Sequence, residues 1–220
     1  MSPSETGFPR YVAIEGPIGV GKTTLAVKLS KQLQARLVLE EFTDNPFLTE
    51  FYRDRQRVAF QTQVYFLIAR YKQQERLRQQ DLFSRAVVSD YVFAKDRIFA
   101  YLNLSEAELQ LYEKIYELIR PTLLTPDLVV YLQARPEVLM QRLRGRGRDF
   151  ESTIEVEYLE NLMRGYNNFF FHYEESPLLV VETSDIDIVN NPQDFDDLVA
   201  VIRRTKKGTN HYIPQPRGVR

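Results

Sequence analysis

A glycine-rich segment near the start of the chain limits the possible folds more than any other feature. Residues 16–24 read Gly-Pro-Ile-Gly-Val-Gly-Lys-Thr-Thr, with four residues between Gly16 and the run Gly21-Lys22-Thr23. In this pattern the glycines let backbone N–H groups surround phosphate oxygens, the lysine reaches the outer phosphates, and the threonine hydroxyl binds Mg²⁺. The sequence therefore predicts a nucleotide-phosphate site made by Gly16, Gly19, Gly21, Lys22, Thr23 and Thr24, with Lys22 also catalytic and Thr23 on the metal.

The flanking residues favour a phosphate-binding loop over a chance match in a turn. Residues 11–14 form a short apolar run typical of a β-strand, and Leu25, Leu29 and Leu33 follow the loop at helical spacing. A strand, a loop and a helix N-terminus thus occur in the required order. The motif alone leaves open which group accepts the phosphoryl group.

Composition narrows the chemistry and the setting. Zero cysteines and two scattered histidines exclude disulfides and argue against a zinc site, so catalysis must come from carboxylates, lysine and arginine. The net charge of −1 argues against general nucleic-acid binding. No apolar run reaches the ~18 residues that span a bilayer, and the N-terminus does not read as a signal peptide. We expect a cytoplasmic protein with no membrane partner.

Five short β-prone runs are separated by helical patterns. This alternation predicts an α/β protein with a doubly wound five-stranded parallel sheet and helices on both faces. We expect a single domain over residues 10–204, between a flexible leader at 1–9 and a C-terminal tail at 205–220. The predicted strands are residues 11–14, 36–39, 86–88, 127–132 and 178–182.

Acidic residues follow the second and third predicted strands. The carboxyl ends of parallel strands face the ligand crevice, so Glu40, Glu41 and Asp90 are candidates for the site. An acid in the position of Asp90 commonly holds Mg²⁺, the alternative being a turn cap. One of the two glutamates should point into the crevice as a base for an alcohol acceptor, because side chains alternate along a strand. The alternative is a solvated strand end.

Arginines are dense near residue 145. Arg142 and Arg146 lie four residues apart on one helical face, and glycines at 145 and 147 separate Arg144, Arg146 and Arg148. This pattern favours a lid that closes over phosphates and neutralises charge on the transferred group. A solvated charge run or a nucleic-acid patch is the alternative, but the aromatic residues of a stacking platform are missing here.

Two further residues are candidates for substrate contact. Gln61 interrupts an otherwise apolar face of a predicted helix, and its carboxamide can pair with a purine edge as donor and acceptor. Tyr52 can bond a sugar hydroxyl. Most aromatic residues at helical spacing nearby belong to the core, and we expect the same of His172 and His211.

With these motifs in place, the chain closely resembles the deoxynucleoside kinase family from Arg10 to about Arg203. The lid with its trailing glutamate is the most specific shared feature. The resemblance rests on Gly21-Lys22-Thr23, Glu41, Phe60-Gln61-Thr62, residues 96–100, Pro126-Asp127, Arg142 with Arg146, Arg148 and Glu151, and Glu157-Tyr158-Leu159.

The resemblance implies a P-loop kinase fold that transfers phosphoryl from ATP or GTP, with Mg²⁺, to the 5′-hydroxyl of a deoxynucleoside. It also implies a homodimer. The roles it suggests are Glu41 as base, Gln61 on the nucleobase, Asp96 near the base pocket, Tyr52 and Glu151 on the 3′-hydroxyl, and Arg142, Arg146 and Arg148 around the phosphates.

The chain departs from the family pattern in two places. The usual Glu-Pro after the second strand is Glu40-Glu41-Phe42, and the usual Glu-Arg-Ser after the third is Asp90-Tyr91-Val92. The second change loses an arginine, so either a lid arginine replaces it or activity is altered. The run 44–47, Asp-Asn-Pro-Phe, and the acid at 90 look more like the bacterial members, which favours deoxyadenosine or deoxyguanosine as acceptor.

Two other functions fit parts of the pattern. A thymidylate-type nucleoside monophosphate kinase shares loop, sheet and lid, but Glu41 and Asp90 would repel the phosphate of its acceptor, which favours an uncharged acceptor. Alternatively, because Tyr91 replaces the family's arginine, the protein could be a nucleotide-binding regulatory module with weak or no catalysis.

Overall fold

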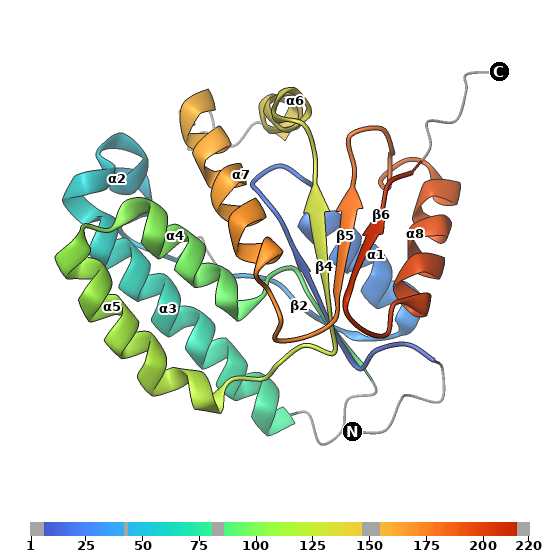
Figure 1. Cartoon of the computed structure of the whole chain (residues 1–220), viewed down its shortest axis with the longest axis horizontal. Helices are drawn as coiled ribbons and strands as arrows, with labels where there is room; N and C mark the ends of the chain where they lie inside the picture. The colour runs from blue at the N-terminus through green and yellow to red at the C-terminus, as the bar shows by residue number, and fades with distance from the viewer. Residues whose placement is uncertain (1–6, 42–43, 81–85, 147–154, 215–220) are drawn as a thin grey trace.

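The computed structural model describes residues 7–41, 44–80, 86–146 and 155–214, in which one parallel β-sheet lies between two layers of helices (Figure 1). The strand order is β2-β3-β1-β4-β5-β6, and every neighbouring pair is parallel. The strands are β1 (Tyr11–Glu15), β2 (Arg36–Val38), β3 (Val87–Ser89), β4 (Leu128–Gln133), β5 (Leu178–Glu182) and β6 (Thr209–Tyr212).

Helices α1 and α8 cover one face of the sheet, and α3, α4, α5 and α7 lie on the other side (Figure 1). The α5 helix starts at the capping box that Ser105 and Glu108 form. The helices are α1 (Lys22–Leu33), α2 (Leu48–Arg53), α3 (Arg55–Gln80), α4 (Asp96–Asn103), α5 (Glu106–Ile119), α6 (Pro136–Arg146), α7 (Val156–Phe171) and α8 (Pro192–Arg204), with short 3₁₀ turns at η1 (Phe93–Lys95) and η2 (Arg120–Thr122).

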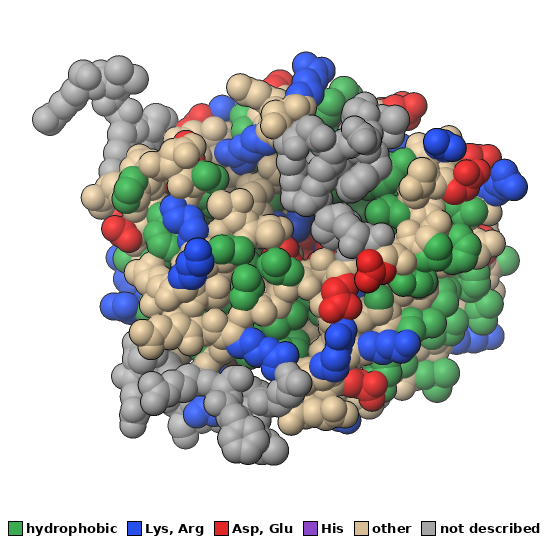
Figure 2. Space-filling view, turned by 180° about the vertical axis from the view of Figure 1, so that it is seen from behind, with side chains coloured by type: hydrophobic (Ala, Val, Ile, Leu, Met, Phe, Trp, Pro, Cys, Tyr) green, Lys and Arg blue, Asp and Glu red, His purple; other side chains and the backbone are tan. Residues whose placement is uncertain are grey.

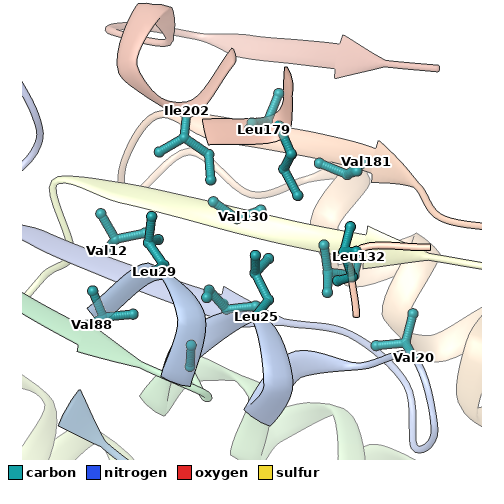
Figure 3. Packing of buried hydrophobic residues seen from close by; sticks show 14 of the residues in the cluster. Val12, Val20, Leu25, Leu29, Val88, Val130, Leu132, Leu179, Val181 and Ile202 are labelled. Atoms are coloured by element: carbon teal, nitrogen blue, oxygen red, sulfur yellow. The ribbon is translucent and has the colours of Figure 1, made fainter. Parts of the chain in front are cut away.

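The core has two layers because side chains alternate along each strand. Val12 and Ile14 of β1 pack with Leu25 and Leu29 of α1 in one buried cluster. Figure 3 shows Val12 beside Leu25 and Leu29 in this cluster. Ala13, between Val12 and Ile14, belongs to the cluster on the α7 side of the sheet. Burial on both faces explains why the central strands read as continuous apolar runs.

The structure confirms the α/β fold and corrects the number of strands. The five predicted strands are present to within one residue at each end, and β6 is a sixth, paired with β5. Residues 209–212 fall in the expected C-terminal tail because β6 is an edge strand whose side chains are largely exposed, so it has no apolar run to reveal it. Among the described residues, no helix is long and apolar enough to cross a membrane.

Candidate active site

The loop between β1 and α1 has the conformation that its glycines permit. Gly16, Gly19 and Gly21 all have positive φ angles, of 150°, 85° and 106°. A Cβ atom on Gly16 would lie 2.4 Å from the carbonyl oxygen of Leu132, so the loop fits against β4 only without a side chain there. Lys22 Nζ donates to the carbonyl oxygens of Gly16, at 2.7 Å, and Pro17, at 3.2 Å. Burial lowers the pKa of Lys22.

Thr23 and Asp90 lie side by side at the carboxyl edge of the sheet. The Thr23 hydroxyl donates to Asp90 Oδ2 at 2.6 Å, and the backbone N–H of Glu40 donates to Asp90 Oδ1 at 2.7 Å. A hydroxyl and a carboxylate beside a phosphate-binding loop suit Mg²⁺, which takes few protein ligands and completes its shell with phosphate oxygens and water. The side chains present therefore fit the predicted metal pair.

The structure separates the two glutamates that follow β2. Glu40 lies at the cavity floor, where its side chain is 15% exposed and accepts from Arg70 Nε at 2.9 Å and Lys95 Nζ at 2.6 Å. Burial alone would raise the pKa of Glu40, but Lys95 and Arg70 outweigh it and hold this pKa well below the ordinary value. The position predicted as the base, Glu41, points elsewhere: its side chain is 49% exposed and pairs with Arg76.

One cavity extends from the phosphate-binding loop, past Glu40, between the helices on the α3 and α7 side. Its floor is polar, with Lys22, Thr23, Glu40 and Asp90. Its walls carry several aromatic side chains, among them Tyr52, the expected sugar contact. The wall residues include Tyr52, Gln63, Phe66, Arg70, Phe99 and Tyr158.

The glutamine that lines this cavity is Gln63, and Gln61 does not line it. Gln61 is exposed on the outer side of α3, whereas Gln63 is 5% exposed. Two residues along a helix differ by about 200°, so neighbouring polar positions of α3 face opposite ways. The spacing of Gln63, Phe66 and Arg70, three and then four residues apart, is the sequence signal that identifies the inward face.

Asp96 lies behind the cavity wall and holds its polar residues. Gln63 Nε2 donates to Asp96 Oδ1 at 2.5 Å, the Tyr112 hydroxyl donates to the same oxygen at 2.9 Å, and Arg70 forms an ion pair with Oδ2. Burial raises the pKa of Asp96, and these partners oppose that effect. Asp96 thus fixes Gln63 and Arg70, and Arg70 joins it to Glu40.

A second hollow lies on the other side of the phosphate-binding loop. It is bounded by residues 19–24, by α6 and by residues 184–190. Arg142 of α6 donates to the carbonyl oxygens of Val20, at 3.3 Å, and Thr183, at 2.9 Å. Burial lowers the pKa of Arg142. The two hollows share Gly19, Lys22 and Thr23.

Three residues with predicted lid roles have side chains outside the described part of the chain. Helix α6 ends at Arg146, whose side chain is outside the described residues, as are Arg148 and Glu151. Their predicted roles therefore stay predictions.

The parallel sheet, the glycine loop and the two hollows that meet on it define a nucleotide-binding phosphotransferase of the P-loop class. The model of the deoxynucleoside kinase family matches residues 12–206, and the chain belongs to this family.

Characterised relatives and solved structures agree with this assignment. The chain is 37% identical over 198 residues to a deoxyguanosine kinase of Bacillus subtilis (strain 168), covering 88% of this chain and 96% of that protein. It is 37% identical over 164 residues to a deoxyadenosine kinase of Dictyostelium discoideum, covering 72% and 66%. The structure of a deoxyadenosine kinase from M. mycoides with bound dATP matches with a TM-score of 0.76 and 27% identity, over 87% of this chain and 98% of that one.

Proposed function

We propose that this protein transfers the γ-phosphoryl group of ATP or GTP to the 5′-hydroxyl of a purine deoxynucleoside, deoxyadenosine or deoxyguanosine. The observation that carries the proposal is the meeting of two hollows on one phosphate-binding loop, with a carboxylate, Glu40, in the aromatic one. The donor phosphates occupy the loop and the acceptor occupies the aromatic cavity. Relatives named deoxyguanosine and deoxyadenosine kinases support a purine acceptor.

On the donor side, Lys22 and the loop N–H groups bind phosphate oxygens, and Thr23 with Asp90 holds Mg²⁺. When bound, Mg²⁺ neutralises charge on the phosphates. Arg142, with Arg146 and Arg148 of the lid, approaches the transferred group from the side of α6. Its present partners are two backbone carbonyl oxygens and the Thr183 hydroxyl, weak competitors for a guanidinium when a phosphate is offered.

On the acceptor side, Glu40 takes the role that the sequence pattern gives to Glu41. Its carboxylate lies in the cavity beside the phosphate-binding loop, where it can accept the proton of the attacking hydroxyl. Gln63 and Arg70 read the base edge in place of Gln61, and Asp96 holds both of them. Tyr52 and Glu151 bind the 3′-hydroxyl of the sugar.

An uncharged acceptor also agrees with the electrostatics of the cavity. Glu40 and Asp90 both line it, and the cations Arg70 and Lys95 of the same cavity are already paired with Glu40, so they are not free for a phosphate on the acceptor. This arrangement favours a nucleoside over the nucleoside monophosphate that a thymidylate-type kinase accepts.

We also propose a cytoplasmic homodimer that binds no nucleic acid. Large apolar side chains are exposed on the outer helices of the α3 and α5 side, with Ile68 at 47%, Leu111 at 50% and Leu118 at 80%. Figure 2 shows hydrophobic side chains grouped at its right edge, the side of these helices in that view. Exposed apolar groups of this kind suit an interface with a second copy.

A product assay tests the proposal directly. The purified protein is incubated with ATP, Mg²⁺ and each of the four deoxynucleosides, and monophosphates are separated by chromatography. We expect deoxyadenosine or deoxyguanosine to give the most product. Phosphorylation of deoxynucleoside monophosphates alone would favour the thymidylate-type alternative, and nucleotide binding with no product would favour a regulatory module.

A further inference from the structure

Lys95 is a buried cation in the acceptor cavity that the sequence pattern did not identify. We infer that Lys95 is a positioning residue for Glu40, and that it supplies the positive charge missing at Tyr91. The inference rests on the proposed kinase activity, in which Glu40 faces the acceptor hydroxyl. In this role, Lys95 holds the Oε2 atom of Glu40 in place through a hydrogen bond.

Lys95 is buried and lies close to two carboxylates. Lys95 ends the 3₁₀ turn η1, and its side chain is 4% exposed. Its Nζ atom lies 2.6 Å from Glu40 Oε2 and 3.9 Å from Glu15 Oε2. An ammonium group this well buried is rare unless it is paired, so the two carboxylates and the lysine stabilise one another.

Lys95 and Arg70 hold different oxygens of Glu40. Arg70 donates to Oε1 from Nε at 2.9 Å and from a terminal nitrogen at 2.5 Å, while Lys95 donates to Oε2 at 2.6 Å. These cations come from α3 and η1, so two separate elements fix the carboxylate plane. Oε2 carries one such bond against two on Oε1, which leaves Oε2 better able to accept from a substrate hydroxyl.

Lys95 also offsets the negative charge of the carboxylates near the acceptor. On the acceptor side, the carboxylates of Glu15, Glu40 and Asp96 pair with the cations of Arg70 and Lys95. Without Lys95, the cations Arg70 and Lys22 would face the four carboxylates of Glu15, Glu40, Asp90 and Asp96 beside the position proposed for the transferred phosphoryl group. Like-charge repulsion would then oppose the transfer most strongly as the group moves toward the acceptor.

Neither Tyr91 itself nor the lid arginine Arg142 is placed to act on Glu40 in the described structure. Tyr91 is fully buried in the core cluster on the α7 side and is not among the residues that line the cavity. Arg142 faces the donor hollow, where it binds Val20 and Thr183. Of the two cations that pair with Glu40, Arg70 is also paired with Asp96. We therefore assign the place of the arginine expected at residue 91 to Lys95, which lies four residues further along the chain.

Steady-state kinetics of three variants test this inference. We expect Lys95→Met to lower kcat about a hundredfold with little change in the KM for ATP, because the interaction matters most in the transition state. Lys95→Arg keeps the charge and should recover most of that loss. Lys206→Met is the matched control, since that exposed lysine contacts Gly7 at the other edge of the sheet. Wild-type kcat in Lys95→Met, or equal losses in Lys95→Met and Lys95→Arg, would overturn the inference.

A double variant separates positioning from a purely structural role. In Glu40→Gln the carboxylate is gone, so adding Lys95→Met should reduce the remaining activity by less than about threefold. The double variant also removes both charges of the pair, which guards against loss of folding from an unpaired buried charge. A multiplicative loss would show that Lys95 does not act through Glu40. An inactive wild-type protein would instead refute the proposed function itself.

Discussion

At the scale of single residues, the site depends on which of two near neighbours points inward. Strand β2 ends at Val38, so Glu40 and Glu41 lie beyond it, where the side chains no longer alternate between the two faces of the sheet. Leu39, between the strand and the glutamates, is itself 38% exposed. Spacing alone therefore could not choose the glutamate in the cavity. What decides it is the pair of cations from α3 and η1, which are distant in sequence.

Two glutamines of α3, Gln63 and Gln61, also face in different directions. We expect Gln63→Leu to lower kcat/KM for the preferred deoxynucleoside by about tenfold to a hundredfold, because a buried donor to Asp96 and a base contact are lost together. Gln61→Leu is the matched control and should stay close to wild type, since Gln61 is exposed. Steady-state kinetics at saturating ATP measure both; equal losses would place Gln61 in the site after all.

At the scale of elements, the sequence predicted the glycine loop and the buried strands, but not the inward face of α3 or the edge strand β6. The loop glycines and the buried strands carry strong local signals, and their predicted positions are confirmed. Helix α3 was predicted as a helix, but its inward face was not identified, since polar residues occur on both sides of it. The edge strand β6 was missed because pairing with β5, and not its own side chains, makes it a strand.

The fit of the glycine loop against β4 makes a prediction about stability. Gly16→Ala brings a Cβ atom against the backbone of Leu132, which cannot move aside easily, so we expect a loss of roughly 1–3 kcal/mol in the free energy of unfolding and weaker ATP binding.

The control is Gly145→Ala in α6. A Cβ atom there has nothing within 4 Å, and alanine favours a helix, so stability should stay equal or rise by roughly 0.5–1 kcal/mol. Urea unfolding compares the three proteins. Equal stability of Gly16→Ala and wild type would mean that the loop does not pack on β4 as described.

At the scale of the whole molecule, the outer helices predict assembly. Leu111 and Leu118 lie seven residues apart on α5, on one face, and both are exposed. We expect the double change Leu111→Lys and Leu118→Lys to convert a dimer into a monomer, measured by light scattering after gel filtration. Phe171→Lys on α7, at a residue 85% exposed, should leave the dimer intact. A wild-type monomer would contradict the proposed dimer.

In the whole molecule, two hollows meet on one phosphate-binding loop, and we place Glu40 on the acceptor side. The most direct test compares kcat of Glu40→Gln and Glu41→Gln with the preferred deoxynucleoside, together with ATP binding by calorimetry. We predict that Glu40→Gln binds ATP normally and loses about 10²–10⁴-fold in kcat, while Glu41→Gln stays within a few-fold of wild type. Full activity in Glu40→Gln, or a greater loss in Glu41→Gln, would contradict this account.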